Sequence, residues 1–215
     1  MDIHLTPVEA RVLGSLIEKD ITTPDYYPLS LNALVNACNQ KNNREPVMNL
    51  DENAVRDALA GLQEQRLAGP ARGADSRITK YEHRLQEVFN FTRGETALLC
   101  VLLLRGRQTP GELRGRTERM FRFEHLDDVE ATLRRLMERD PPLVKVLQRQ
   151  PGTKESRYAH LLSGETQETE NVPVGVLPSS TGDDRMGKLE AQIAELRRKL
   201  HELRQEFGEF KKQLE

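Results

Sequence analysis

The chain has 215 residues, of which 37% are hydrophobic and 31% charged, with a formal net charge of −2. This length has room for one large domain or two small ones. The near-neutral balance gives no global basic field that would announce nucleic-acid binding, and no acidic field that would exclude it. We see no secretory leader and no apolar run near the roughly 20 residues of a membrane span, so we expect a cytoplasmic protein without membrane association.

Three helices are predicted in the first half of the chain, from amino-terminal caps and apolar stripes at helical spacing. Thr6 opens the first helix, and Glu9 completes a capping box. The second helix is short and covers roughly residues 30–38. The third begins near Asn49, with Glu52 three residues on as another capping box.

Two strands are predicted after the third helix, which ends before Gly69. The second strand contains the sequence KYEHRL at residues 80–85, whose alternate residues would lie on opposite faces of a half-buried sheet. The same pattern (basic, Tyr, any, His, any, Leu) returns as RYAHLL at residues 157–162. This repetition indicates a duplicated module.

The second half repeats the predicted elements in the same order. Helices are expected from Thr92, from Thr109 and over about residues 124–139, and a hairpin from Leu143. The apolar residues of the third helix, in VEATLRRLMER, match those of VRDALAGLQEQ in the first half. Three helices followed by a two-stranded ribbon is the order of a winged helix-turn-helix.

These elements predict a mainly α fold with small β-hairpins (α+β). Two tandem winged helix-turn-helix modules are expected at residues 1–87 and 88–163. Residues 164–184 are acidic, rich in Gly, Pro, Ser and Thr and without periodicity, which predicts a flexible linker. Residues 185–215 are predicted to form a C-terminal coiled-coil helix.

The tail carries apolar residues at alternating spacings of three and four from Met186 onward, which is a heptad seam. A narrow seam on a helix roughly 45 Å long needs a partner helix, so we expect a homodimer. Folding of the tail back onto its own body is the alternative, which the linker permits. The residues expected at the dimer interface are Leu189, Ile193, Leu196, Leu200, Leu203, Phe207, Phe210 and Leu214.

Several longer motifs resemble the YceH family, a bacterial group of tandem winged-helix proteins. They are TPDYYPLS from Thr23, ACNQKNNREPV from Ala37, LRGRQTPGEL from Leu104 and RYAHLL from Arg157. The resemblance covers about residues 5–164 and implies the fold. It implies no ligand, substrate or catalytic residue.

The sequence shows no recognisable enzyme chemistry. Its histidines are dispersed, and neither Cys38 nor Cys100 has a second ligand at metal-binding spacing. There is no phosphate-cradling glycine loop and no nucleophile elbow. We therefore expect a non-enzymatic protein without cofactor or metal, in which both cysteines are buried thiols and His83 and His160 are structural.

The charges of the third helices do not favour the usual mode of DNA reading. In winged helices the third helix usually enters the major groove, while the wing contacts phosphate. Acids outnumber bases over residues 51–66 and 124–140 and crowd the first turns, where they suit the helix dipole but would repel phosphate. Positive charge lies elsewhere, mainly in six arginines over residues 105–122 and in the 39–44 loop.

We therefore predict a transcriptional-regulator-like protein that binds duplex DNA with weak specificity through wings and basic loops. The alternative is a protein-interaction adaptor that does not bind DNA directly, an analogy of fold alone. A solvated charged surface would account for any one of these groups by itself. The residues expected at the DNA interface are Lys41, Asn42, Asn43, Arg44, Lys80, Arg114, Arg116, Arg119, Arg122 and Lys154.

Overall fold

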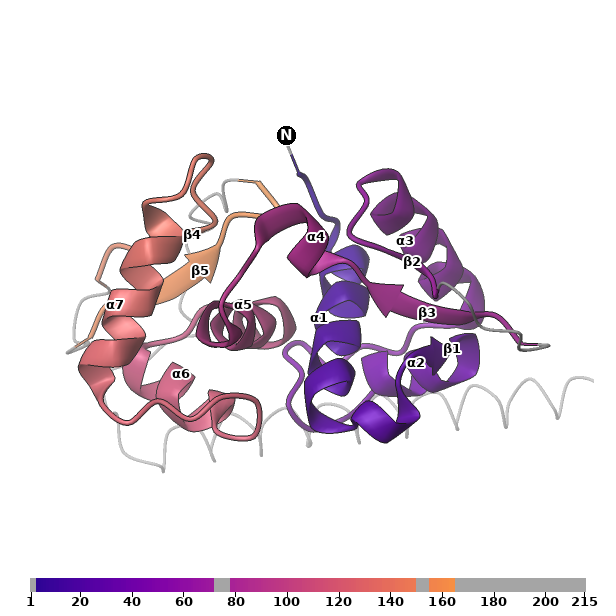
Figure 1. Cartoon of the computed structure of the whole chain (residues 1–215), viewed down its shortest axis with the longest axis horizontal. Coiled ribbons are helices and arrows are strands. Elements are labelled where there is room, and N and C mark those ends of the chain that lie inside the picture. The colour runs from indigo at the N-terminus through magenta and orange to yellow at the C-terminus, as the bar shows by residue number, and fades with distance from the viewer. Residues whose placement is uncertain (1–2, 72–77, 150–154, 165–215) are drawn as a thin grey trace, which may run out of the picture. The chain divides into compact units, whose positions relative to one another are not determined.

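The computed structural model describes residues 3–71, 78–149 and 155–164, which belong to one compact unit (Figure 1). Lys154, the predicted linker and the predicted coiled-coil helix lie outside these residues. The fold is mainly helical with small antiparallel sheets, which confirms the predicted α+β class. Within the described ranges, no helix is both long and apolar enough to cross a membrane.

The first half contains the three expected helices, a 3-10 turn, a further short helix and a three-stranded sheet. Thr6 caps the first helix as predicted, because the Glu9 N–H donates to Thr6 Oγ1 at 3.2 Å and the Thr6 N–H donates to Glu9 Oε2 at 2.7 Å. Ser30 caps the second helix. The elements in chain order are α1 (Pro7–Thr22), the 3-10 turn η1 (Pro24–Tyr26), β1 (Leu29–Ser30), α2 (Leu31–Cys38), α3 (Glu52–Glu64), β2 (Ala68–Pro70), β3 (Lys80–His83) and α4 (Leu85–Phe89).

Two boundaries in this half differ from the prediction. The cap of α3 is Asp51 and not Asn49, since Asp51 Oδ1 accepts the Ala54 N–H at 2.8 Å. The KYEHRL strand ends at His83 and does not reach Leu85, which is fully buried and begins the short helix α4. The alternation of residue types in KYEHRL cannot show that the strand ends at His83, because burial of Leu85 depends on tertiary packing.

The second half repeats the order of three helices followed by a strand pair. Both expected helix starts carry capping boxes, at Thr92 with Glu95 and at Thr109 with Glu112. The first of these helices ends at Gly106, whose φ of +69° favours glycine. The elements are α5 (Arg93–Arg105), α6 (Pro110–Thr117), α7 (Leu126–Met137), β4 (Val144–Val146) and β5 (Tyr158–His160).

The backbone pairing of the two sheets matches between the halves. Strand β3 pairs with β2 and β5 pairs with β4, so that His83 lies opposite Ala68 and His160 opposite Val144. The tyrosine two residues before the histidine of each motif also pairs with a residue on the opposite edge of its strand. Tyr81 pairs with Leu29 of β1, while Tyr158 forms an isolated bridge with Gln108. The KYEHRL and RYAHLL motifs therefore occupy equivalent positions in their sheets.

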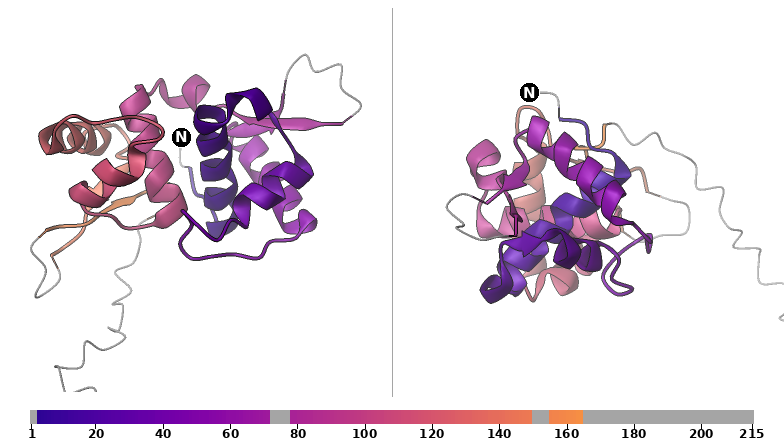
Figure 2. Two further views of the ribbon diagram at one scale, coloured as in Figure 1. Left: turned by 90° about the horizontal axis from the view of Figure 1, so that it is seen from below. Right: turned by 90° about the vertical axis from the view of Figure 1, so that its right-hand side faces the viewer.

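The two halves, which we call the first and second copy, share one apolar core through α1 and α5 (Figures 1 and 2). Gly14 on α1 permits this close packing, because a Cβ there would lie 2.9 Å from side-chain atoms of Leu104 and 3.2 Å from Leu103 Cβ. Cys100 Sγ donates to the Gly14 carbonyl at 3.4 Å. Cys100 and Cys38 are both free and buried, as predicted.

Candidate nucleic-acid interface

The 39–50 loop of the first copy is held firmly in place. Buried Arg11 on α1 donates to the Cys38 carbonyl at 3.1 Å and to the Pro46 carbonyl at 2.6 Å. The Glu45 N–H donates to the Leu104 carbonyl at 2.9 Å, which ties the loop to α5 of the second copy. Satisfied backbone groups of this kind fix a loop's position. The loop therefore forms a defined edge where the two copies meet.

Arg44 in this loop, predicted as a phosphate contact, is a buried structural residue in its observed position. Its side chain is 0% exposed and donates to Glu18 at 2.6 and 3.1 Å and to the Ala37 carbonyl at 2.9 and 3.1 Å. Burial alone would raise the pKa of Glu18, but the hydrogen bonds and charge of Arg44 lower it below its ordinary value. No Arg44 donor is free at the surface.

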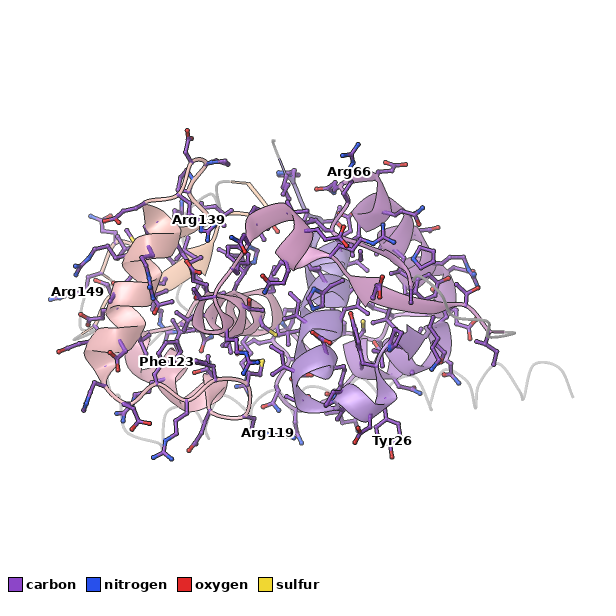
Figure 3. All side chains as sticks on the ribbon, in the orientation of Figure 1. Tyr26, Arg66, Arg119, Phe123, Arg139 and Arg149 are labelled. Atoms are coloured by element: carbon purple, nitrogen blue, oxygen red, sulfur yellow. The ribbon has the colours of Figure 1, made fainter. Side chains whose placement is uncertain are left out.

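Of the other predicted residues of this loop, Asn43 lines a cleft between the copies. The cleft has a volume of about 410 Å³. From the first copy it is lined by the carboxyl end of α1 and by Gln40 and Asn43. From the second copy it is lined by Arg105 of α5, by α6 and by Arg119. Figure 3 shows Arg119 at the edge where the copies meet. Lys41 and Asn42 are exposed between the two lining residues of the loop.

Four cations line this cleft, at Lys19, Arg105, Arg116 and Arg119. Arg105 donates a hydrogen bond to Asn43 Oδ1 of the other copy. Burial lowers the pKa of Arg105, and the charge of Arg116 lowers it further. Arg119 is exposed and has no ion-pair partner among the described residues. The cleft is therefore a place where positive charge from both copies gathers.

The remaining predicted residues lie in different settings. Arg114 is exposed, but it donates to the carbonyls of Phe123 and Glu124 at 3.3 and 2.7 Å, so it also positions the loop before α7. The side chain of Arg122 is 73% exposed and lies 3.7 Å from Glu124. Lys80 is half-buried on β3 and does not line the cleft. Lys154 lies outside the described residues.

The third helices present acidic surfaces, as their sequences indicate. Glu52, Asp57 and Glu64 are exposed on α3, and Asp127 and Glu130 are exposed on α7. The acidic character of these two helices could be predicted from the sequence, because charge at exposed helical positions is a local property. Its consequence is that neither third helix offers a phosphate-attracting amino-terminal turn.

Lys19 and Gln40 were not foreseen as site residues. Lys19 Nζ lies 3.5 Å from both Glu18 Oε2 and Gln40 Oε1 at the cleft wall. Lys19 stands in no motif, and Gln40 stands in the ACNQKNNREPV motif without having been singled out. Their meeting with Arg105 and Arg116 depends on the packing of α1 against α5, for which the sequence carries no local signal.

The two equivalent histidines differ in environment. His83 Nε2 lies 3.2 Å from Asp20 Oδ2, and the His83 backbone N–H donates to Tyr27 Oη at 2.7 Å, which suits the predicted structural role. Burial lowers the pKa of His160 to about 4, and its Nδ1 has no partner within the described part of the chain. In that same part, no three His, Cys, Asp or Glu side chains are grouped as metal ligands.

These features define an α+β protein in which two similar copies pack around one core and share a basic cleft. The chain belongs to the UPF0502/YceH family, which confirms the predicted resemblance: residues 5–153 match the family described as "Protein of unknown function, DUF480". It is 57% identical over 197 residues to a UPF0502 protein of Koribacter versatilis, covering 91% of this chain and 92% of that protein.

Two further relatives are matched over nearly their whole length. A UPF0502 protein of Pelobacter propionicus is 52% identical over 221 residues, which cover 100% of both proteins. The UPF0502 protein YceH of Salmonella arizonae is 46% identical over 216 residues, which cover 97% of this chain and 100% of that protein.

Proposed function

We propose that this chain is a non-enzymatic tandem winged helix-turn-helix protein that binds duplex DNA at a basic surface built by both copies. In each copy the order of three helices and an antiparallel strand pair supports the winged-helix assignment. One observation carries the DNA-binding proposal. Asn43 of the first copy and Arg116 and Arg119 of the second, all predicted as contacts from sequence, line the same cleft.

The proposed binding is dominated by the DNA backbone. Exposed cations such as Lys41, Arg119 and Arg122 would neutralise phosphates and release counterions. Acidic turns on α3 and α7 oppose entry of either helix into the major groove, so base reading contributes little. We expect weak sequence preference and non-specific Kd values on the order of 10⁻⁶–10⁻⁴ M.

The test is fluorescence anisotropy with labelled random-sequence duplex DNA at about 50–200 mM salt. Arg119→Gln with Arg122→Gln should weaken binding by roughly tenfold or more, since two phosphate contacts are lost. The matched control is Arg134→Gln with Arg135→Gln, which removes two exposed arginines from α7. Equal losses of DNA affinity in the two double variants would contradict the proposed site. No binding by the wild type at the lowest salt would contradict the function.

A homodimer through residues 186–215 remains part of the proposal. The two protein chains of a homodimer would present two DNA-binding surfaces, which raises the avidity for a long duplex without any new contact. The heptad seam in the sequence is the support for this dimer.

The second candidate function is a protein-interaction adaptor. It is favoured by a groove of about 540 Å³ along α7, lined by Phe121, Phe123 and Ala131 among others. Ala131→Arg would fill this groove, whereas Ala60→Arg at an exposed position of α3 provides the matched control. A partner that is retained by the control and lost by Ala131→Arg would support an adaptor.

A further inference from the structure

We propose that the recess of the cleft between the copies is a binding site for a small phosphate-bearing molecule. The recess is formed by Lys19, Arg105 and Arg116, below the more exposed Arg119. The recess lies within the cleft that supports the DNA proposal and shares Arg116 with it, whereas the other proposed DNA contacts are exposed residues at and beyond the rim. It does not depend on DNA being bound.

Positive charge exceeds negative charge around the recess, which favours the binding of an anion. Four cations line the cleft against two carboxylates, Glu18 and Glu118. Glu18 is already engaged by the buried guanidinium of Arg44 at 2.6 Å. Arg105 and Arg116 both line the cleft, and burial and then the charge of Arg116 lower the pKa of Arg105. A bound dianion would relieve the repulsion between these guanidiniums.

The cations are held in place while donors remain available. Asn43 accepts from Arg105, and Glu112 lies 3.5 Å from Arg116. Each of these contacts uses one nitrogen, whereas a guanidinium has five N–H donors and binds phosphate through two at once. The Lys19 and Arg116 side chains are 19% and 29% exposed, so solvent screens them less than surface charges.

The shape of the cleft fits a phosphate joined to an organic group. Its volume of about 410 Å³ falls within the range of small-molecule sites. Val101, Leu104 and Met120 add an apolar wall beside the cations. At Gly115, which also lines the cleft, an added Cβ would meet nothing within 4 Å. The ligand would touch both copies and thereby stabilise their packing.

Gly115 provides a matched pair of variants. Gly115→Glu adds a carboxylate to the cleft lining, and Gly115→Gln adds a neutral side chain of the same size there. Gly115 is exposed on α6, so the two variants should fold alike, which circular dichroism would verify. Arg56→Gln serves as a charge control outside the cleft, because Arg56 is exposed on α3 and does not line the cleft.

The experiment is isothermal titration of the full chain with inorganic pyrophosphate at fixed ionic strength. We expect 1:1 binding per chain with a Kd at or below about 1 mM, retained by Gly115→Gln and Arg56→Gln and weakened about tenfold or more by Gly115→Glu. Absence of binding by the wild type would overturn the proposal. So would equal affinities of Gly115→Glu and Gly115→Gln.

A second arm distinguishes a free ligand from a DNA phosphate. The titration is repeated with the chain saturated by a short duplex. Pyrophosphate binding that persists supports a separate site for a small molecule. Loss of pyrophosphate binding would assign the recess to the DNA backbone and overturn the proposal. Failure to bind DNA at all would leave the pyrophosphate result standing, so the two proposals fail separately.

Discussion

The structural role of Arg44 gives a strong prediction for stability. Arg44→Met keeps most of the aliphatic volume but removes the donors to Glu18, the Ala37 carbonyl and the Asn43 carbonyl. Removing one partner of a buried ion pair leaves the other charge uncompensated and costs about 3–5 kcal/mol. This is a large part of the roughly 5–15 kcal/mol that stabilises a typical protein.

The free energy of unfolding would be measured by urea titration followed by far-ultraviolet circular dichroism, together with Tm. At about 2–4 °C per kcal/mol for this chain length, Tm should fall by roughly 6–20 °C. Lys41→Met in the same loop is the control, because Lys41 is exposed and its replacement should change stability by about 0.5 kcal/mol or less. A loss below about 1 kcal/mol for Arg44→Met would refute the reasoning.

The Arg44–Glu18 ion pair also predicts how the difference in free energy of unfolding between wild type and Arg44→Met varies with pH. The pKa of Glu18 lies below its ordinary value in the folded state, so the pair stabilises above the ordinary pKa of Glu. This stabilisation is lost as pH falls through the lowered pKa. The gap between wild type and Arg44→Met should therefore narrow in acid. A double variant with Glu18→Gln should be more stable than Arg44→Met alone, since it leaves no unpaired charge.

Three further predictions concern packing, titration and assembly. Gly14→Ala should destabilise by about 1–3 kcal/mol in urea titrations, because its Cβ would crowd Leu104, whereas Gly111→Ala, with its nearest neighbour at 3.8 Å, should not. Since burial holds the pKa of His160 near 4, wild-type stability should decline as pH falls from about 6.5 toward 4, and His160→Gln should decline less over that window. Leu200→Asp should convert a dimer to a monomer in analytical ultracentrifugation, and an unchanged mass would contradict the predicted seam.

Helix starts were predictable because caps are local. The Thr6 and Thr92 boxes each need one hydroxyl and one carboxylate three residues apart, and both are present. The third helix was misplaced by two residues. Asn49 and Asp51 are both good caps, and it is the Asp51 carboxylate that reaches a free N–H. A pattern of residue types does not choose between two nearby caps.

Contacts between distant residues were not predictable. The composition of the 39–44 loop suggested that all its cations were exposed, but Glu18 on α1 draws Arg44 inside. The alignment of the two copies showed equivalent residues, yet it did not show that α1 and α5 pack together at Gly14. That packing of α1 against α5 places Lys19 and Arg105 in the lining of one cleft. Local spacing encodes helices and strands, whereas the cleft arises from their assembly.

The salt dependence of DNA affinity tests most directly whether one surface built by both copies binds the backbone. The slope of log K against log salt concentration would be measured for wild type, Lys41→Gln, Arg119→Gln and the double variant. Each substitution should reduce the steepness of the slope by about 0.9, and the double variant should reduce it by about 1.8. A wild type that does not bind at about 50 mM salt, or a double variant with the wild-type slope, would contradict the account.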